Sequence, residues 1–174
     1  MTPSHADTEG VTRAQGQSES MVTGPDVRFY HLTRHRLEQA LPQLLARSLE
    51  RDWRAVVRTG SVERRSYLSN VLWTAQPDSF LPHGTEEDGK AALQPIWITE
   101  QDENPNGGSV LFLTDGTDTE APTLFETVCI LFDGNDPDAV AVARRQWSTK
   151  KAQGFRLAYW AQDERGGWTK KMET

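Results

Sequence analysis

A run of apolar residues, Thr127 to Phe132, constrains the fold of this chain more than any other segment. It reads Thr-Val-Cys-Ile-Leu-Phe and lacks the polar alternation of a strand that has one face in water. Such a run is typical of a strand in the middle of a sheet that is covered on both faces. The run therefore predicts a layered fold in which a sheet lies between other elements.

Strands and helices alternate towards both ends of the chain. Aromatic and β-branched residues predict strands, and apolar residues at helical spacing predict helices. Besides 127–132, we expect strands at 27–32, 53–59, 95–99, 109–114 and 155–162, and helices at about 33–49, 61–72 and 137–153. This order predicts an α/β fold that is Rossmann-like and layered, with a mainly parallel mixed sheet flanked by helices.

Residues that commonly begin or end helices mark the limits of the expected helices. Thr33, Ser61 and Asp136 stand before the three helices, and their side-chain oxygens can cap the first turn. Pro137 suits the first helical position, and Gly154 suits the C-terminal end. The third helix is therefore the one with the best-defined limits.

The 174 residues are enough for one domain with its own core. Residues 1–25 hold almost no large apolar side chains, so they cannot bury enough surface to offset the entropy of ordering. We expect a disordered N-terminal tail at 1–25 and a single α/β domain at 26–163. Residues 164–174 are polar apart from Trp168, and we expect a frayed C-terminal tail there.

The charge of the chain limits its partners. The formal net charge is −6, which argues against bulk nucleic-acid binding because a basic surface is expected for that function. Between Ala139 and Gln162, however, there are five cations and no acid. A basic stretch on an acidic protein points to a local anionic partner.

Cysteine usage and hydropathy point to the cytoplasm. A single cysteine, Cys129, excludes a disulfide framework and a cysteine-rich zinc site, and it fits a reducing compartment. No run of about 18 apolar residues is present, so no transmembrane helix is expected. The first residues show no signal-peptide pattern either.

The stretch from Leu72 to Gly84 is an unusual loop. It contains two prolines and two large aromatic residues, Trp73 and Phe80, where a surface loop is expected. Loops usually lie on the surface, because burial would leave backbone polar groups without partners. An aromatic loop therefore either folds back onto the core or offers a contact site to another protein.

The expected helix at 137–153 carries a mixed stripe. At 100° per residue, one stripe holds Val140, Arg144, Trp147 and Lys151, with Ala143 and Lys150 beside it. An aromatic ring between cations can receive a chain that is both acidic and aromatic. The alternative is that Trp147 belongs to the core and the cations form a solvated rim.

The chain lacks the common sequence motifs of catalytic, nucleotide-binding and metal-binding sites. It has no phosphate-binding loop, no dinucleotide-binding glycine pattern and no nucleophile elbow, so we expect no cofactor. His31 and His35 are four residues apart, but a third metal ligand is lacking at a usual spacing. Cys129 lies among apolar residues, which raise the pKa of a thiol. We therefore expect neither a catalytic residue nor a metal site.

Three pieces of the chain share a pattern with a known family. They are Phe-Tyr-His-Leu at 29–32, Leu-Trp-Thr-Ala-Gln-Pro-Asp-Ser-Phe-Leu-Pro-His at 72–83, and Ala-Arg-Arg-Gln-Trp at 143–147 with Gly-Phe at 154–155. The middle piece is the most specific, with a tryptophan, a proline four residues later, and then Ser-Phe-x-Pro-His. On these residues the chain resembles the chi subunit of bacterial DNA polymerase III holoenzyme, a clamp-loader accessory subunit.

The resemblance implies a non-catalytic α/β protein with two contact surfaces in the replisome. One surface binds a psi subunit, or a helicase-like competitor, through residues that correspond here to Trp73, Phe80, Pro82 and His83. The other binds the acidic, Phe-ending C-terminal tail of single-stranded DNA-binding protein, through Arg144, Trp147, Lys150 and Lys151. The family often has a lysine where this chain has Ser148, so Lys150 or Lys151 would share that role.

Two other functions stand beside this one. A small α/β hydrolase-like enzyme would use His83 with Asp78 or Asp88 as its acid–base pair. A direct single-strand binder would stack bases on exposed aromatic residues, although the acidic net charge opposes strong DNA binding. The accessory role predicts a cytoplasmic, replisome-associated protein without a membrane partner.

Overall fold

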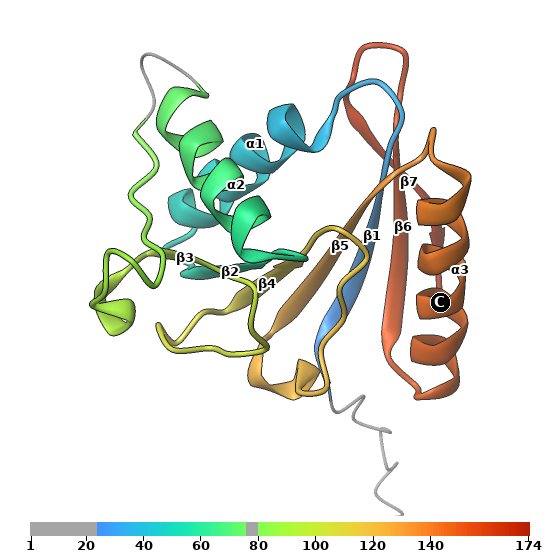
Figure 1. Ribbon diagram of the computed structural model, residues 1–174. Helices are drawn as coiled ribbons and strands as arrows, with labels where there is room; N and C mark the ends of the chain where they lie inside the picture. Colours follow the sequence, from blue (N-terminus) through green and yellow to red (C-terminus); the bar gives the residue numbers. More distant parts are fainter. Residues whose placement is uncertain (1–23, 76–79) are drawn as a thin grey trace, which may run out of the picture.

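The computed structural model describes residues 24–75 and 80–174, which form an α/β fold around one mixed sheet (Figure 1). The order of the strands across the sheet is β3-β2-β4-β5-β1-β6-β7. The strands are β1 (Asp26–Leu32), β2 (Ala55–Arg58), β3 (Ile96–Thr99), β4 (Val110–Leu113), β5 (Thr127–Asp133), β6 (Arg156–Gln162) and β7 (Trp168–Glu173). All neighbours pair in parallel except β6 and β7, which pair antiparallel. The predicted fold class is confirmed.

Helices cover both faces of the sheet. The helices are α1 (Leu37–Glu50), α2 (Val62–Thr74) and α3 (Pro137–Ala152), with short 3-10 turns η1 (Ala91–Leu93) and η2 (Pro122–Leu124). The pair α1–α2 and the helix α3 lie on opposite sides of the sheet (Figure 1). The central strand β5 is buried from Thr127 to Phe132, as its continuous apolar run predicts.

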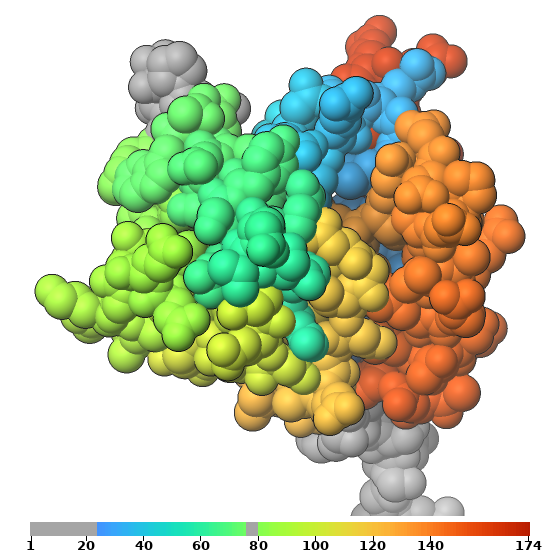
Figure 2. Space-filling view, in the orientation of Figure 1, coloured from blue at the N-terminus to red at the C-terminus, as the bar shows by residue number. Residues whose placement is uncertain are grey.

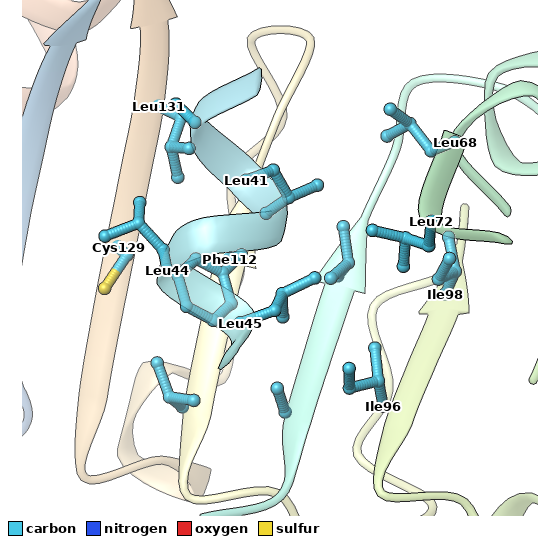
Figure 3. Close-up of a cluster of buried hydrophobic side chains, with 14 of the residues drawn as sticks. Leu41, Leu44, Leu45, Leu68, Leu72, Ile96, Ile98, Phe112, Cys129 and Leu131 are labelled. Carbon is cyan, nitrogen blue, oxygen red and sulfur yellow. The ribbon is translucent and has the colours of Figure 1, made fainter. Parts of the chain in front are cut away.

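The two layers of the core follow from the period of the strands. Successive side chains of a strand point to opposite faces, so each buried strand contributes to both layers. On the α1–α2 face, leucines of the helices pack on alternate residues of the strands (Figure 3). Leu45 and Leu68 are fully buried there, against Ile98 and Phe112. On the other face, Phe29, Ile130 and Leu157 pack beneath α3.

The expected caps of the second and third helices are present. The Ser61 hydroxyl accepts a hydrogen bond from the Arg64 backbone amide at 3.2 Å, and the Asp136 carboxylate accepts one from Asp138 at 3.0 Å. Gly154 follows α3 with a φ of 85°. Glycine adopts this left-handed conformation without strain, because it has no Cβ.

The first helix begins later than expected, at Leu37 rather than just after Thr33. The side-chain oxygen of Gln162 accepts hydrogen bonds from the backbone amides of Thr33, Arg34 and His35, at 3.0–3.1 Å. These amides are therefore fastened to the end of β6 and are not available to a helix. A partner 127 or more residues away cannot be read from the local sequence.

The predicted frayed tail at 164–174 is wrong, because Trp168–Glu173 forms strand β7 beside β6. The Asp163 carboxylate accepts hydrogen bonds from the amides of Arg165 and Gly167, which closes a tight turn. Gly166 completes that turn with a φ of 80°. Trp168 then packs against Tyr30, with ring centroids 5.0 Å apart.

Two predicted features fall partly or wholly outside the described residues. Of the expected N-terminal tail at 1–25, only Gly24 and Pro25 are among the described residues. Residues 76–79 of the aromatic loop also lie outside them. Within the described ranges, none of the helices is long and apolar enough to cross a lipid bilayer.

Candidate partner-binding surfaces

The end of α2 and the segment that follows it present two large aromatic side chains to solvent. Trp73 is 55% exposed and Phe80 is 72% exposed. Their ring centroids lie 5.8 Å apart, so the two rings form one exposed cluster, which we call the aromatic surface. Its position follows from helix geometry: Leu72 faces the core, so the next residue turns outward.

A fixed base holds the aromatic surface in place. Leu81 and His83 are buried behind Phe80, and Pro82 is half-buried. The Gly84 amide donates a hydrogen bond to the Ile96 carbonyl at 3.0 Å, and the Ile98 amide donates one to the Gly84 carbonyl at 3.0 Å. These bonds add residue 84 to the edge of the sheet at β3, so Phe80 projects from a segment that is anchored there.

His83 supports this surface and is not itself exposed. Its ring lies 4.3 Å from the Trp73 ring, centroid to centroid, and its exposed fraction is 6%. Its Nδ1 lies 2.7 Å from the Leu81 carbonyl oxygen, and its Nε2 lies 3.1 Å from the Ser69 hydroxyl. His83, which is predicted to contact a partner, therefore lies beneath Trp73 and not at the surface.

The hydrolase-like alternative finds no support in the described residues. Neither ring nitrogen of His83 contacts a carboxylate there. The Asp88 carboxylate instead accepts hydrogen bonds from the Thr85 backbone amide at 2.9 Å and from the Thr85 hydroxyl at 3.3 Å. Asp78, the other proposed partner, lies outside the described residues.

The outer face of α3 forms the second candidate site. Arg144 and Lys151 are exposed, and Trp147 lies between them, half-buried. The Trp147 ring meets Phe29 edge to face at 5.2 Å and Tyr159 at 6.2 Å. Trp147 thus packs against the core and is also partly exposed between the two cations. We call Arg144, Trp147 and Lys151 the α3 surface.

Lys150, which is predicted to bind the acidic tail, does not lie on the α3 surface. Its side chain is 4% exposed, and its Nζ lies 2.8 Å from an Asp118 carboxylate oxygen. The neighbouring Gln146 side chain donates a hydrogen bond to the Thr117 carbonyl at 2.9 Å. Both side chains bind the 114–121 loop to α3, so their role is structural.

Tyr159 and His31 extend the α3 surface and were missed from the sequence. The Tyr159 hydroxyl and the His31 Nδ1 atom share a hydrogen bond beside Trp147. Burial raises the pKa of Tyr159, and the charge of nearby Arg144 opposes that rise. Burial lowers the pKa of His31. The only sequence signal for Tyr159 was its place in a predicted strand, which does not show a face.

The two histidines at 31 and 35 do not form a metal pair. His31 bonds Tyr159, whereas the His35 Nδ1 lies 3.0 Å from the Gln162 side-chain nitrogen. Across residues 24–75 and 80–174, no group of three or more histidine, cysteine or acidic side chains could hold a metal ion.

Comparisons with known proteins place the chain in a family. Residues 25–158 match the family model described as DNA polymerase III chi subunit, HolC. The chain belongs to the DNA polymerase III chi subunit family. It is also 34% identical, over 90 residues, to the "Probable DNA polymerase III subunit chi" of Rickettsia prowazekii (strain Madrid E). That alignment spans 52% of this chain and 54% of the relative, so the chain spans about half the length of the curated relative that it matches.

The chi family match includes the aromatic surface and the α3 surface but not strand β7. The resemblance predicted from the sequence is therefore confirmed at the level of the family. The two surfaces are separate, because α2 and α3 cover opposite faces of the sheet. In Figure 2 the segment coloured yellow lies between α2 (green) and α3 (orange).

Proposed function

We propose that the protein is a non-catalytic accessory subunit of the DNA polymerase III clamp-loader complex. In this role it links the holoenzyme to single-stranded DNA-binding protein through the acidic C-terminal tail of that protein. It also binds a psi-type partner, or a helicase-like competitor, through the aromatic surface. Membership of the chi family supports the role, and the two surfaces supply its contacts.

The observation that carries this proposal is the exposure of Trp73 and Phe80 on a fixed base. Aromatic residues are enriched at protein interfaces, and a few of them commonly carry most of the binding energy. Here two rings lie together, 55% and 72% exposed, while the residues behind them are buried. Little conformational entropy is lost when such a surface docks, because its base is already ordered.

The α3 surface suits an acidic tail that ends in phenylalanine. Within the described residues, neither Arg144 nor Lys151 forms an ion pair, so both can receive carboxylates. Trp147 and Tyr159 offer an apolar wall for the terminal ring. Contacts of this size are weak, on the order of micromolar or about 8 kcal/mol, and salt screens them over about 10 Å at about 0.1 M.

Calorimetry with a peptide of acidic residues ending in phenylalanine tests the α3 surface. We expect the double change Arg144→Ala, Lys151→Ala to weaken binding more than tenfold, with folding intact because both residues are exposed. The matched control is Arg145→Ala, Lys171→Ala, which removes equal charge at two other exposed positions. Equal loss in both variants would mean that the peptide responds to net charge alone and that the site is misplaced.

Binding to a psi subunit tests the aromatic surface. Trp73→Ala or Phe80→Ala should each lower the affinity about thirtyfold, the equivalent of about 2 kcal/mol for an aromatic anchor. The control is Leu124→Ala, which shortens an apolar side chain that is 58% exposed on η2. If psi binding survives the changes at both Trp73 and Phe80, the interface lies elsewhere. Circular dichroism must show that each variant is folded.

A further inference from the structure

A cleft of about 160 Å³ lies on the α1–α2 face of the sheet, between the C-terminal end of α1 and strands β1 and β6. Arg28 and Tyr30 of β1, Arg47 at the end of α1, and Arg51 just after it contribute to its lining. Trp168 of β7 closes one side. The cleft is on the opposite face of the sheet from α3, so it is separate from the α3 surface.

Among the described residues, the cleft is lined by three arginines and by no carboxylate. In the same part of the chain, none of Arg28, Arg47 and Arg51 forms an ion pair. Two nearby acids are engaged elsewhere, since Asp26 pairs with Arg156 at 3.0 Å and Glu173 pairs with Lys170 at 2.9 Å. Glu50 and Asp52 flank Arg51 in the sequence but do not line the cleft. Arg47 and Arg51 are also four residues apart along the chain, a helical spacing at which like charges repel. An anion would relieve that repulsion.

Aromatic rings form the walls of the cleft. Tyr30 stacks on Trp160 with ring centroids 6.4 Å apart, and the Arg51 guanidinium lies 5.2 Å from the Trp53 ring. The Trp160 indole nitrogen is buried and has no hydrogen-bond partner in the part of the chain that is described. A buried donor without a partner is costly, so each such group calls for an explanation. A bound acceptor would satisfy it.

Part of this wall lies outside the chi family match. That match ends at residue 158, before Trp160 and Trp168. The hairpin of β6 and β7 brings Trp168 over Tyr30, and without that hairpin the cleft would lack one side. Two of the lining residues, Trp160 and Trp168, therefore come from the segment beyond the family match, whereas the three arginines lie within it.

We propose that this cleft binds a phosphate monoester that carries a planar ring, the chemistry of a mononucleotide. Guanidinium and indole groups only donate hydrogen bonds, so the ligand must supply acceptors. A phosphate monoester carries a charge of about −1.5 to −2 and three acceptor oxygens, which match three cations better than a single carboxylate does. The aromatic walls contact the ring.

The size of the cleft limits the ligand to one nucleotide unit. At about 160 Å³ the cleft is small, so it has room for a phosphate and a ring but not for a second nucleotide. The same chemistry occurs in a free nucleotide and at the phosphorylated 5′ end of a DNA strand. Binding at that end needs no sequence reading and no broad basic surface.

Titration calorimetry of the full chain with deoxyadenosine monophosphate tests the proposal. We expect a dissociation constant below about 1 mM and binding that is at least tenfold weaker for Arg47→Ala, Arg51→Ala. Both side chains are exposed, so this variant should stay folded. Trp160→Phe, which keeps a ring but removes the indole N–H, should weaken binding several-fold. The matched control, Arg34→Ala, Arg145→Ala, removes two exposed arginines that do not line the cleft and should bind as the natural chain does.

A comparison of several ligands identifies which chemical group the cleft binds. Deoxyadenosine without phosphate should bind at least tenfold more weakly, and N-acetylphenylalanine, an aromatic carboxylate, should do the same. An oligonucleotide with a 5′ phosphate that binds better than its 5′-hydroxyl form would identify a DNA end as the source, whereas binding of the monophosphate alone would identify a free nucleotide. No binding by the natural chain, or equal binding by the Arg47→Ala, Arg51→Ala variant, overturns the proposal.

Discussion

Replacing either member of the Lys150–Asp118 pair should destabilise the fold, but by unequal amounts. The Lys150 side chain is 4% exposed, whereas the Asp118 side chain is 46% exposed. Asp118→Asn leaves a buried ammonium group without a counter-charge, and breaking a buried pair in this way costs about 3 kcal/mol. Lys150→Met leaves a carboxylate that water can reach, so the loss should be about 1 kcal/mol, the upper range of an exposed pair.

Urea denaturation measures the difference. With a slope of about 2 kcal/mol per molar urea, Asp118→Asn should lower the midpoint by about 1.5 M and Lys150→Met by about 0.5 M. The double variant should resemble Lys150→Met, because its buried charge has been removed. Equal losses for the two single variants, or a double variant less stable than Asp118→Asn, would refute the claim that burial of the ammonium group sets the cost.

The remaining predictions concern one binding control and two buried polar groups. Because Lys150 is paired and buried, Lys150→Met should change the affinity for the acidic peptide less than twofold, and a large loss in the folded variant would return this lysine to the binding site. Burial raises the pKa of the Cys129 thiol to about 12 from an ordinary 9.0, so it should react with a disulfide reagent at neutral pH only after unfolding. The protonated thiol also favours the folded state, so stability should fall as the pH rises above 9.0, and Cys129→Ala should flatten that limb in pH-dependent urea melts. Gln162→Ala leaves the amides of residues 33–35 without their acceptor. This loss should cost about 2 kcal/mol in the same urea assay. Gln153→Ala, at an exposed position, is the neutral control.

Much of the fold could be predicted because its signals are local. The apolar run of β5, the caps at Ser61 and Asp136, and the Gly154 end of α3 each depend on neighbouring residues. The start of α1 and the strand β7 could not be predicted in the same way. Each depends on contacts between distant segments, from Gln162 to residues 33–35 and from Trp168 to Tyr30.

The candidate surfaces show the same division. The aromatic loop predicted either a segment folded onto the core or a contact site, and the structure shows Trp73 and Phe80 exposed. The helical stripe brought Arg144, Trp147 and Lys151 together, but it could not show that Lys150 has a partner on the 114–121 loop. The arginines of the cleft come from β1 and from the end of α1. No periodic pattern in the sequence predicts that these two segments lie together.

The pairing of Gly84 with β3 has a consequence for solubility. An exposed strand edge is a template for association with another chain, and natural sheets protect their edges with charges or with a covering segment. Here β7 carries charged Lys170, Lys171 and Glu173 at one edge, whereas β3, with four buried residues, is protected at the other by the segment that presents Phe80. A change that releases this segment would uncover an apolar edge, so the protein would aggregate as well as lose the aromatic surface.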